Sequence, residues 1–172
     1  MGVQTIVPNL WFDTQAEEAA KYWVEVFSGR IGAEGRAKSE IVNVSRYPQD
    51  MFDGAKKAGD VLTVDFTIEG QRFTAINGGP EFKFDEAVSF LVNCESQEEI
   101  DELWDKLGAG GEHGPCGWLK DKYGLSWQIV PAEIEQLMLG GPDEEGKKRA
   151  FAAMMQMKKL DIAELRRAYE GK

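Results

Sequence analysis

Two stretches of the sequence, PNLWFDTQAEEAAKYWVEVF at residues 8–27 and VSFLVNCESQEEIDELWDKL at residues 88–107, follow one pattern. Each begins with an apolar strand, passes through a polar segment with paired glutamates, and ends in an amphipathic helix that carries a tryptophan. Each is followed by further strands that meet at a glycine turn. Because a repeated unit governs the choice of fold, the sequence predicts two βαβββ modules.

Local signals set the expected limits of these elements. The first helix is predicted to begin at a capping box formed by Thr14 and Glu17, and the second at a cap formed by Ser96. Residues 61–79 alternate apolar and polar side chains about a turn at Gly70, which indicates a β-hairpin. Each module therefore places one helix between its first strand and the strands that follow.

The predicted fold class is α+β, with the strands of both modules in one curved, glyoxalase-like mixed sheet around a cleft and with helices outside it. Module one is expected at about residues 1–84 and module two at about residues 85–131. Together they form a paired βαβββ domain over residues 1–131. Residues 132–172 are expected to form a C-terminal helical extension that packs on this domain or on a dimer partner.

Composition excludes several classes of partner. The chain has 172 residues and is 42% hydrophobic, which is enough for a sizeable core. Its formal net charge of −10 disfavours nucleic acids and anionic membranes, since both bind basic surfaces. No apolar run is long enough to cross a bilayer and no signal peptide is evident, so we expect a cytoplasmic protein. Its two cysteines, Cys94 and Cys116, are then expected to be free thiols.

Three further stretches, with the two repeats, carry a resemblance to a known family. They are VLTVDFTIEGQRFTAINGGPEFKF (61–84), GPCGWLKDKYGLSWQIVP (114–131) and MMQMKKLDIAEL (154–165). The chain resembles the PhnB-like family, also known as the 3-demethylubiquinone-9 3-methyltransferase domain, of the vicinal oxygen chelate superfamily. That superfamily includes glyoxalase I, bleomycin-resistance proteins and extradiol dioxygenases. The resemblance implies paired modules around a cleft, and it implies a homodimer.

The resemblance also implies a metal site, which this sequence does not complete. Enzymes of the superfamily hold a metal with His or Gln on the first strand of each module and with Glu on the last. Those positions fall at Val7 and Ala87 and at Thr74 and Gln128. A slip in the strand register would bring in Asn9, Ser89 or Asp65, none of which is a histidine. A catalytic divalent ion needs about three protein ligands, and neutral oxygens alone bind it weakly. We therefore expect no bound metal.

The methyltransferase name implies S-adenosylmethionine, but the glycine runs do not suit a nucleotide cofactor. Such a cofactor is bound where a glycine-rich turn joins a strand to a helix. The run at residues 78–79 follows a hairpin strand without leading into a helix, and the run at residues 108–111 follows a helix. No cofactor is therefore expected.

Strand alternation predicts which side chains face the cleft. The expected ligand-binding residues are Asn9, Trp11, Thr63, Thr74, Asn77, Phe82, Ser89, Trp118 and Gln128. A wall of aromatic and apolar side chains with a few amides and hydroxyls is typical of a small-molecule pocket. The alternative is a filled, barrel-like core whose polar groups are satisfied.

Asp65 is the candidate catalytic residue, because it lies between Val64 and Phe66 in a central strand. A buried carboxylate without a partner has a raised pKa and can act as a proton donor or base. A salt bridge or an exposed strand face is the alternative. His113 and Cys116 lie near a Gly-Pro turn, and we expect a surface histidine and no catalytic cysteine.

Two functions follow from these expectations. The first is a metal-free protein that binds a small organic molecule in the cleft, as bleomycin-resistance proteins do for sequestration. The second is a lyase, isomerase or dioxygenase of the same superfamily that uses a metal or Asp65 as its base. The missing metal ligands favour the first function, while the identity of the ligand and the pairing of the modules stay open.

Overall fold

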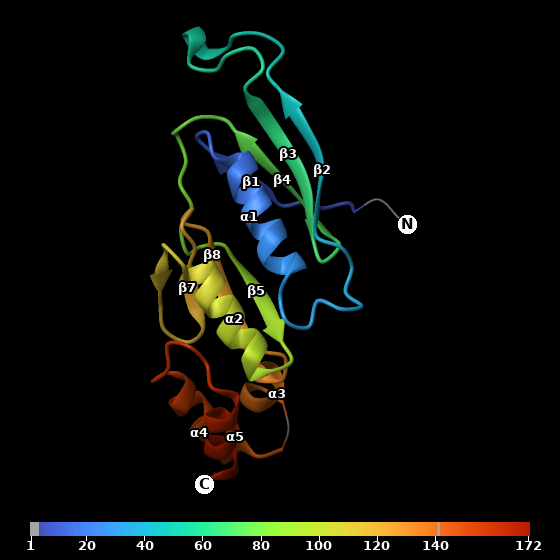
Figure 1. Ribbon diagram of the computed structural model, residues 1–172. Helices are drawn as coiled ribbons and strands as arrows, with labels where there is room; N and C mark the ends of the chain where they lie inside the picture. Colours follow the sequence, from blue (N-terminus) through green and yellow to red (C-terminus); the bar gives the residue numbers. More distant parts are fainter. Residues whose placement is uncertain (1–3, 141) are drawn as a thin grey trace. The chain divides into compact units, whose positions relative to one another are not determined.

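The computed structural model describes residues 4–140 and 142–172. The chain divides into two compact units, Met1–Lys83 and Phe84–Lys172. Each unit contains a four-stranded mixed sheet and a helix that follows its first strand (Figure 1). The predicted α+β class and the two βαβββ modules are confirmed. Within the described residues the strands form one sheet in each unit, so the expectation of one continuous sheet is corrected to two.

The first unit has its strands in the order β1-β4-β3-β2. Strand β1 is parallel to β4, and the other neighbouring strands are antiparallel. The elements are β1 (Asn9–Phe12), α1 (Ala16–Ser28), β2 (Glu40–Arg46), the short 3-10 helix η1 (Phe52–Gly54), β3 (Val61–Ile68) and β4 (Gln71–Asn77). Helix α1 lies along one face of this sheet (Figure 1).

Helix α1 buries the residues that its periodicity predicts: Ala16, Ala19, Ala20, Trp23 and Phe27. The Trp23 ring stacks on Phe66 of β3 with ring centroids 5.8 Å apart, which joins the helix to the sheet. These residues recur every three or four positions, so they share one face of the helix. The core of the first unit therefore lies between α1 and its sheet.

The start of α1 differs from the expected capping box at Thr14 and Glu17. The helix begins after Gln15, which makes no side-chain capping bond. Instead the Asn77 Oδ1, at the end of β4, accepts a hydrogen bond of 2.8 Å from the backbone N–H of Ala16. A residue distant in sequence thus satisfies a helix N–H that a local cap normally takes.

The second unit repeats the arrangement of the first, with strand order β5-β8-β7-β6. Its elements are β5 (Ser89–Cys94), α2 (Gln97–Gly108), β6 (Glu112–His113), β7 (Trp118–Lys120) and β8 (Ser126–Pro131). Strand β5 is parallel to β8, as β1 is to β4. The predicted cap at Ser96 is confirmed, since its hydroxyl accepts a hydrogen bond from the N–H of Glu99.

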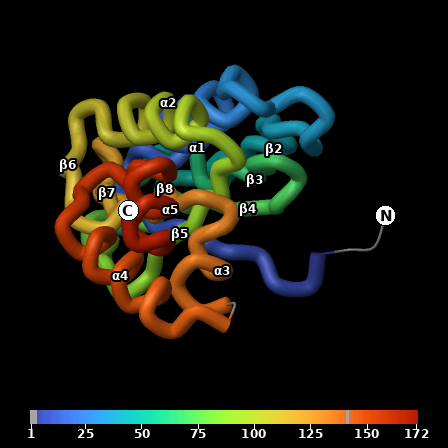
Figure 2. The backbone as a smooth tube through the Cα atoms, turned by 90° about the horizontal axis from the view of Figure 1, so that it is seen from below, coloured from blue at the N-terminus to red at the C-terminus, as the bar shows by residue number. Residues whose placement is uncertain are grey.

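Three C-terminal helices, α3 (Ile134–Met138), α4 (Glu144–Met154) and α5 (Ile162–Glu170), belong to this second unit. They gather at one end of it (Figures 1 and 2). A small apolar core joins Val130 of β8 to Leu137, Leu160 and Leu165. In the described residues no helix combines the length and the apolar character that crossing a membrane requires.

Candidate functional site

Each sheet has one face against its module's helix and one face turned away from it, which we call the distal face. In β1 the buried residues Leu10 and Phe12 face the helix, and Asn9 and Trp11 lie on the distal face. The same alternation in β3 and β4 places Thr63, Asp65 and Thr74 on the distal face. In the second module it places Ser89, Trp118, Lys120, Ser126 and Gln128 there.

Asp65 of the first module has partners on this face. The Thr74 hydroxyl donates a hydrogen bond of 2.6 Å to Asp65 Oδ1, and the Arg72 guanidinium lies 3.6 Å from the same oxygen. Thr74 in turn stands opposite Asn9 in the strand register. The carboxylate therefore matches the salt-bridge alternative rather than an isolated, buried acid.

Trp11 and Phe82 lie together on the first module. The indole Nε1 of Trp11 donates a hydrogen bond of 2.8 Å to the carbonyl of Gly79, and its ring meets Phe82 edge to face with centroids 5.1 Å apart. Phe82 is 65% exposed. A Cβ atom on Gly78 would lie 2.1 Å from the Trp11 ring, so glycine is required there for packing. The role of glycine at position 78 is therefore to make room for the Trp11 ring.

Thr63 and Asn77 differ in where they point. The Thr63 hydroxyl lies 2.5 Å from the hydroxyl of Ser45 on β2. Asn77 is buried on the helix-facing side, where its amide bonds to α1 and donates to the carbonyl of Val61. Asn77 lies an odd number of residues from Thr74 on β4, so the two point to opposite faces. The expected ligand-binding role of Asn77 is corrected to a structural one.

The second module arranges its distal face in two rows across the strands. One row runs Ser89, Ser126, Lys120 and Glu112 from β5 to β6. The next row runs Leu91, Gln128 and Trp118. The Gln128 amide donates a hydrogen bond of 2.8 Å to the Ser89 hydroxyl, which ties the two rows together.

The ends of the parallel strand pairs show which positions are equivalent in the two modules. The amide of Gly78 donates to the carbonyl of Phe12, and the amide of Ala132 donates to that of Cys94. Counted back by the same number of residues from these ends, Thr74 stands opposite Asn9 in the first module and Gln128 stands opposite Leu91 in the second. The two pairs therefore occupy equivalent positions. The predicted equivalence of Thr74 and Gln128 therefore fits the register.

The same count corrects one position. Val7 lies five residues before Phe12, and its counterpart five residues before Cys94 is Ser89, not Ala87. The donor set at the implied metal positions is then an apolar side chain and three neutral groups. No cluster of three His, Cys, Asp or Glu side chains suited to a metal ion occurs in residues 4–140 and 142–172. These residues do not fit a divalent ion.

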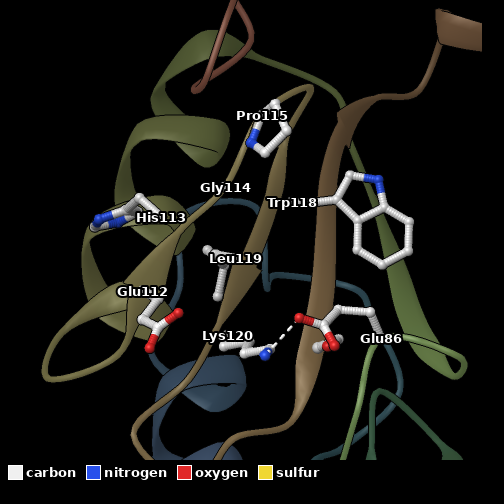
Figure 3. Close-up of a pocket in the computed structure, with 9 residues that line it drawn as sticks. Glu86, Glu112, His113, Gly114, Pro115, Trp118, Leu119 and Lys120 are labelled. Carbon is white, nitrogen blue, oxygen red and sulfur yellow. Dashed lines mark ion pairs between the residues drawn. The ribbon is translucent and has the colours of Figure 1, made fainter.

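A pocket of about 350 Å³ lies on the second module (Figure 3). The residues that line it include Trp118, Lys120 and Ser126 from the two rows, together with Glu86 and Glu112. Ser126 is only 1% exposed, and its hydroxyl has no hydrogen-bond partner among the residues that the structure describes. The pocket thus combines an indole ring, an ion pair and an unsatisfied hydroxyl.

An ion pair crosses the edge of this pocket. Lys120 Nζ lies 2.5 Å from Glu86 Oε1 (Figure 3). The hydrogen bond from Lys120 holds the pKa of the Glu86 carboxyl below its ordinary value. The same bond raises the pKa of the Lys120 ammonium, and the charges of Glu112 and Asp85 act in the same direction. Both groups are therefore charged at neutral pH.

The Lys120→Met variant is expected to raise the pKa of Glu86 toward its ordinary value. Because the folded-state pKa of Glu86 is lowered, its contribution to stability is present above the unfolded-state pKa and is lost as pH falls through the folded-state value. A carboxyl ¹³C NMR titration measures this pKa directly. The Lys148→Met variant on α4 is the control, and an unchanged Glu86 titration in Lys120→Met would contradict the pairing.

His113 and Cys116 do not form a pair. The exposed His113 stacks on Trp104 of α2 with ring centroids 4.6 Å apart, and its ring points away from Trp118 (Figure 3). Cys116 instead contacts the C-terminal helices, where its thiol lies 3.6 Å from the carbonyl of Met154. The expectation of a surface histidine is confirmed. Cys116 belongs to the packing of the extension rather than to a cleft.

The second glycine run also has a packing role. A Cβ atom on Gly108 would lie 2.1 Å from the His113 ring, and one on Gly111 would lie 2.0 Å from the carbonyl oxygen of Lys120. Both glycines allow β6 and β7 to approach α2 closely. Gly78 of the first run likewise makes room for the Trp11 ring. Neither run therefore forms the phosphate-binding turn of a nucleotide site.

Sequence reasoning missed several residues of the pocket. Lys120 could be read from the alternation of Trp118, Leu119 and Lys120, which puts the first and third on one face. Glu86 precedes β5, and Glu112 belongs to a strand of only two residues. Neither carries a periodic signal, because their positions depend on pairing with distant strands.

Comparison with known proteins places these features in a family. The family model of 3-demethylubiquinone-9 3-methyltransferase matches residues 4–130. A PhnB protein from Bacillus cereus with the same enzyme name is 35% identical, and the alignment covers 75% of this chain and 100% of that one with a TM-score of 0.59. The search among curated proteins found no match.

Two more distant structures also match this chain, and the first of them shares its fold. Protein PA1353 from Pseudomonas aeruginosa is 16% identical, and the alignment covers 75% of this chain and 98% of that one with a TM-score of 0.57. The fosfomycin resistance protein FosX from Listeria monocytogenes is 14% identical, and the alignment covers 79% of this chain and 95% of that one with a TM-score of 0.48. Helices α3, α4 and α5 lie beyond the residues that the family model matches.

Proposed function

The chain belongs to the PhnB-like 3-demethylubiquinone-9 3-methyltransferase family, and from this premise we propose that it binds a small organic molecule on the distal face of its second module without a metal ion. The pocket at Trp118 carries this proposal. Its volume of about 350 Å³ and its combination of an aromatic ring with a few polar groups suit such a ligand. Family membership alone does not set the chemistry, because one fold hosts many activities.

The state of the implied metal positions supports binding without a metal. Gln128 and Ser89 are already hydrogen-bonded to each other, and Thr74 is already hydrogen-bonded to the Asp65 carboxylate. The packing roles of the glycine runs likewise give no support to methyl transfer from S-adenosylmethionine.

The enzyme alternative rests on Asp65, and its surroundings favour a structural role. The carboxylate accepts a hydrogen bond from the Thr74 hydroxyl and lies 3.6 Å from the Arg72 guanidinium, so it already has partners on this face. Binding is therefore the function that we propose. The proposal includes a homodimer in the cytoplasm, as the family resemblance and the two free thiols suggest.

The purified protein is expected to contain no stoichiometric Zn, Ni, Mn or Fe by elemental analysis. Its melting temperature is expected to rise with at least one molecule from a panel of small organic metabolites. Saturation at 100 times Kd stabilises a folded protein by about 2.7 kcal/mol. The Trp118→Ala variant is expected to lose most of this gain, because Trp118 is an aromatic residue that lines the pocket.

The Phe151→Ala variant is the matched control, since Phe151 is an exposed aromatic residue on α4 away from this pocket. It is expected to keep the full temperature shift. One equivalent of metal in the purified protein would overturn the metal-free proposal. A shift of equal size in Trp118→Ala would overturn the placement of the ligand.

A further inference from the structure

Ser126, whose hydroxyl has no partner among the described residues, is one of the residues that line the pocket on the second module. It is 1% exposed. A buried hydroxyl without a partner is costly, and native proteins leave few of them. A ligand in the pocket that reached this hydroxyl would satisfy it.

Charged residues neighbour Ser126 in the strand register and line the same pocket. Lys120 stands opposite Ser126 in the register, and Glu112 stands opposite Lys120. Glu86 pairs with Lys120, and the charge of Asp85 acts on the same ammonium. Among the residues that line the pocket, one positive charge and two negative ones leave an acidic rim, on a chain with a formal net charge of −10. This field attracts cations and repels anions.

An indole ring completes the wall. Trp118 lies in the row next to Lys120 and Ser126 and forms one side of the pocket (Figure 3). The face of an indole ring packs against flat apolar groups and attracts cations. The acidic rim, the buried hydroxyl and the ring are separate features, and they favour the same chemistry.

On the basis of the proposed function, we propose that this pocket takes a small molecule in which a protonated amine is joined to a flat, apolar body. The body packs on Trp118, and the Ser126 Oγ accepts an N–H of the amine. Glu86 and Glu112 attract the amine through their charge. Lys120 opposes it, because its ammonium neutralises Glu86 in the free protein.

Three matched probes separate the charge of the ligand from its apolar body. They are 2-(1-naphthyl)ethylamine, 2-(1-naphthyl)ethanol and 1-naphthylacetate, which share the ring and differ in the polar end. Isothermal titration calorimetry of the full-length protein at pH 7 and low salt measures their affinities. The amine is expected to bind at least about tenfold more tightly than the carboxylate, with the alcohol between them. High salt is expected to reduce this preference.

Variants at the rim test the named groups. Glu112→Gln is expected to weaken binding of the amine about threefold and to leave the alcohol unchanged. Lys120→Met frees the Glu86 carboxylate and is expected to strengthen binding of the amine by several fold. Glu98→Gln, at an exposed position on α2, is the charge-matched control and is expected to change neither affinity.

Ser126→Ala distinguishes a binding hydroxyl from a structural one. This variant is expected to weaken binding of the amine and to melt no lower than the wild type, because the hydroxyl has no protein partner to lose. A lower melting temperature would show that Ser126 stabilises the free protein and would overturn its role in binding.

The outcomes separate this inference from the proposed function. If the alcohol or the carboxylate binds as tightly as the amine, the inference fails while the proposed function stands. If none of the three probes binds to the protein, both fail for this pocket. A preference for the amine that is undiminished in Glu112→Gln and falls in Lys120→Met would also overturn the inference, because the charge effects would have the wrong sign.

Discussion

Replacement of Asp121 by alanine is expected to lower the free energy of unfolding by about 4 kcal/mol. Asp121 is 2% exposed, and its carboxylate accepts hydrogen bonds from the N–H groups of Tyr123 and Leu125 and from the indole N–H of Trp127. These bonds are 2.9, 3.1 and 2.9 Å long. Alanine would leave all three donors without this acceptor, and each orphaned buried donor costs about 1–3 kcal/mol.

The Asp121→Asn variant is the matched control. Its side-chain oxygen can still accept the two backbone N–H groups, but its NH₂ group would face the N–H of Trp127. The expected loss is therefore smaller, about 2 kcal/mol. Urea denaturation followed by circular dichroism measures both variants. A loss below about 1 kcal/mol in Asp121→Ala would contradict this account.

Asp121 also affects the pocket, because its hydrogen bonds to Tyr123 and Leu125 stabilise the turn between β7 and β8. The residues between β7 and β8 set Trp118 opposite Gln128 and Lys120 opposite Ser126. A variant that loosens this turn is expected to weaken ligand binding as well as stability. The more stable Asp121→Asn variant is the one in which binding can be measured.

Replacement of Trp23 by alanine is expected to cost about 4 kcal/mol of stability. Trp23 is 0% exposed, and its ring stacks on Phe66 at 5.8 Å and lies 6.1 Å from Phe12. Its removal takes apolar surface from the core and leaves a cavity that the sheet cannot fill without moving. Trp23→Phe leaves a smaller gap, and its expected loss is about 2 kcal/mol.

The part of the chain that is destabilised in the Trp23→Ala variant tests the division into two units. Each unit has its own buried core, so hydrogen exchange of Trp23→Ala is expected to quicken more in residues 4–83 than in residues 84–172. Equal loss of protection in both units would contradict this expectation. The Trp118→Ala variant, with its changed residue in the second unit, is the comparison.

The sequence predicted the secondary structure where the signal was local. The apolar positions of α1 and α2 recur every three or four residues, and those of β3 every two, so the buried faces followed from sequence alone. The cap at Ser96 was predicted for the same reason, because its partner Glu99 lies only three residues away. The repeat of these patterns determined the two modules.

Capping of α1 shows where local signals fail. Thr14 and Glu17 have the spacing of a capping box, yet the acceptor comes from Asn77 at the far end of the module. The parallel pairing of β1 with β4 brings that amide to the start of the helix. Asn77 was predicted to bind a ligand because its polarity is visible in the sequence, whereas its partner is not.

The candidate site divides in the same way. Strand alternation alone placed Gln128 on the face that lines the cleft, and the family resemblance identified which metal ligands are missing. Only the tertiary structure joined Lys120 to Glu86 and left the Ser126 hydroxyl buried without a partner. Alternation along a strand is a property of neighbouring residues, whereas an ion pair or an unsatisfied group depends on which distant segments the sheet brings together.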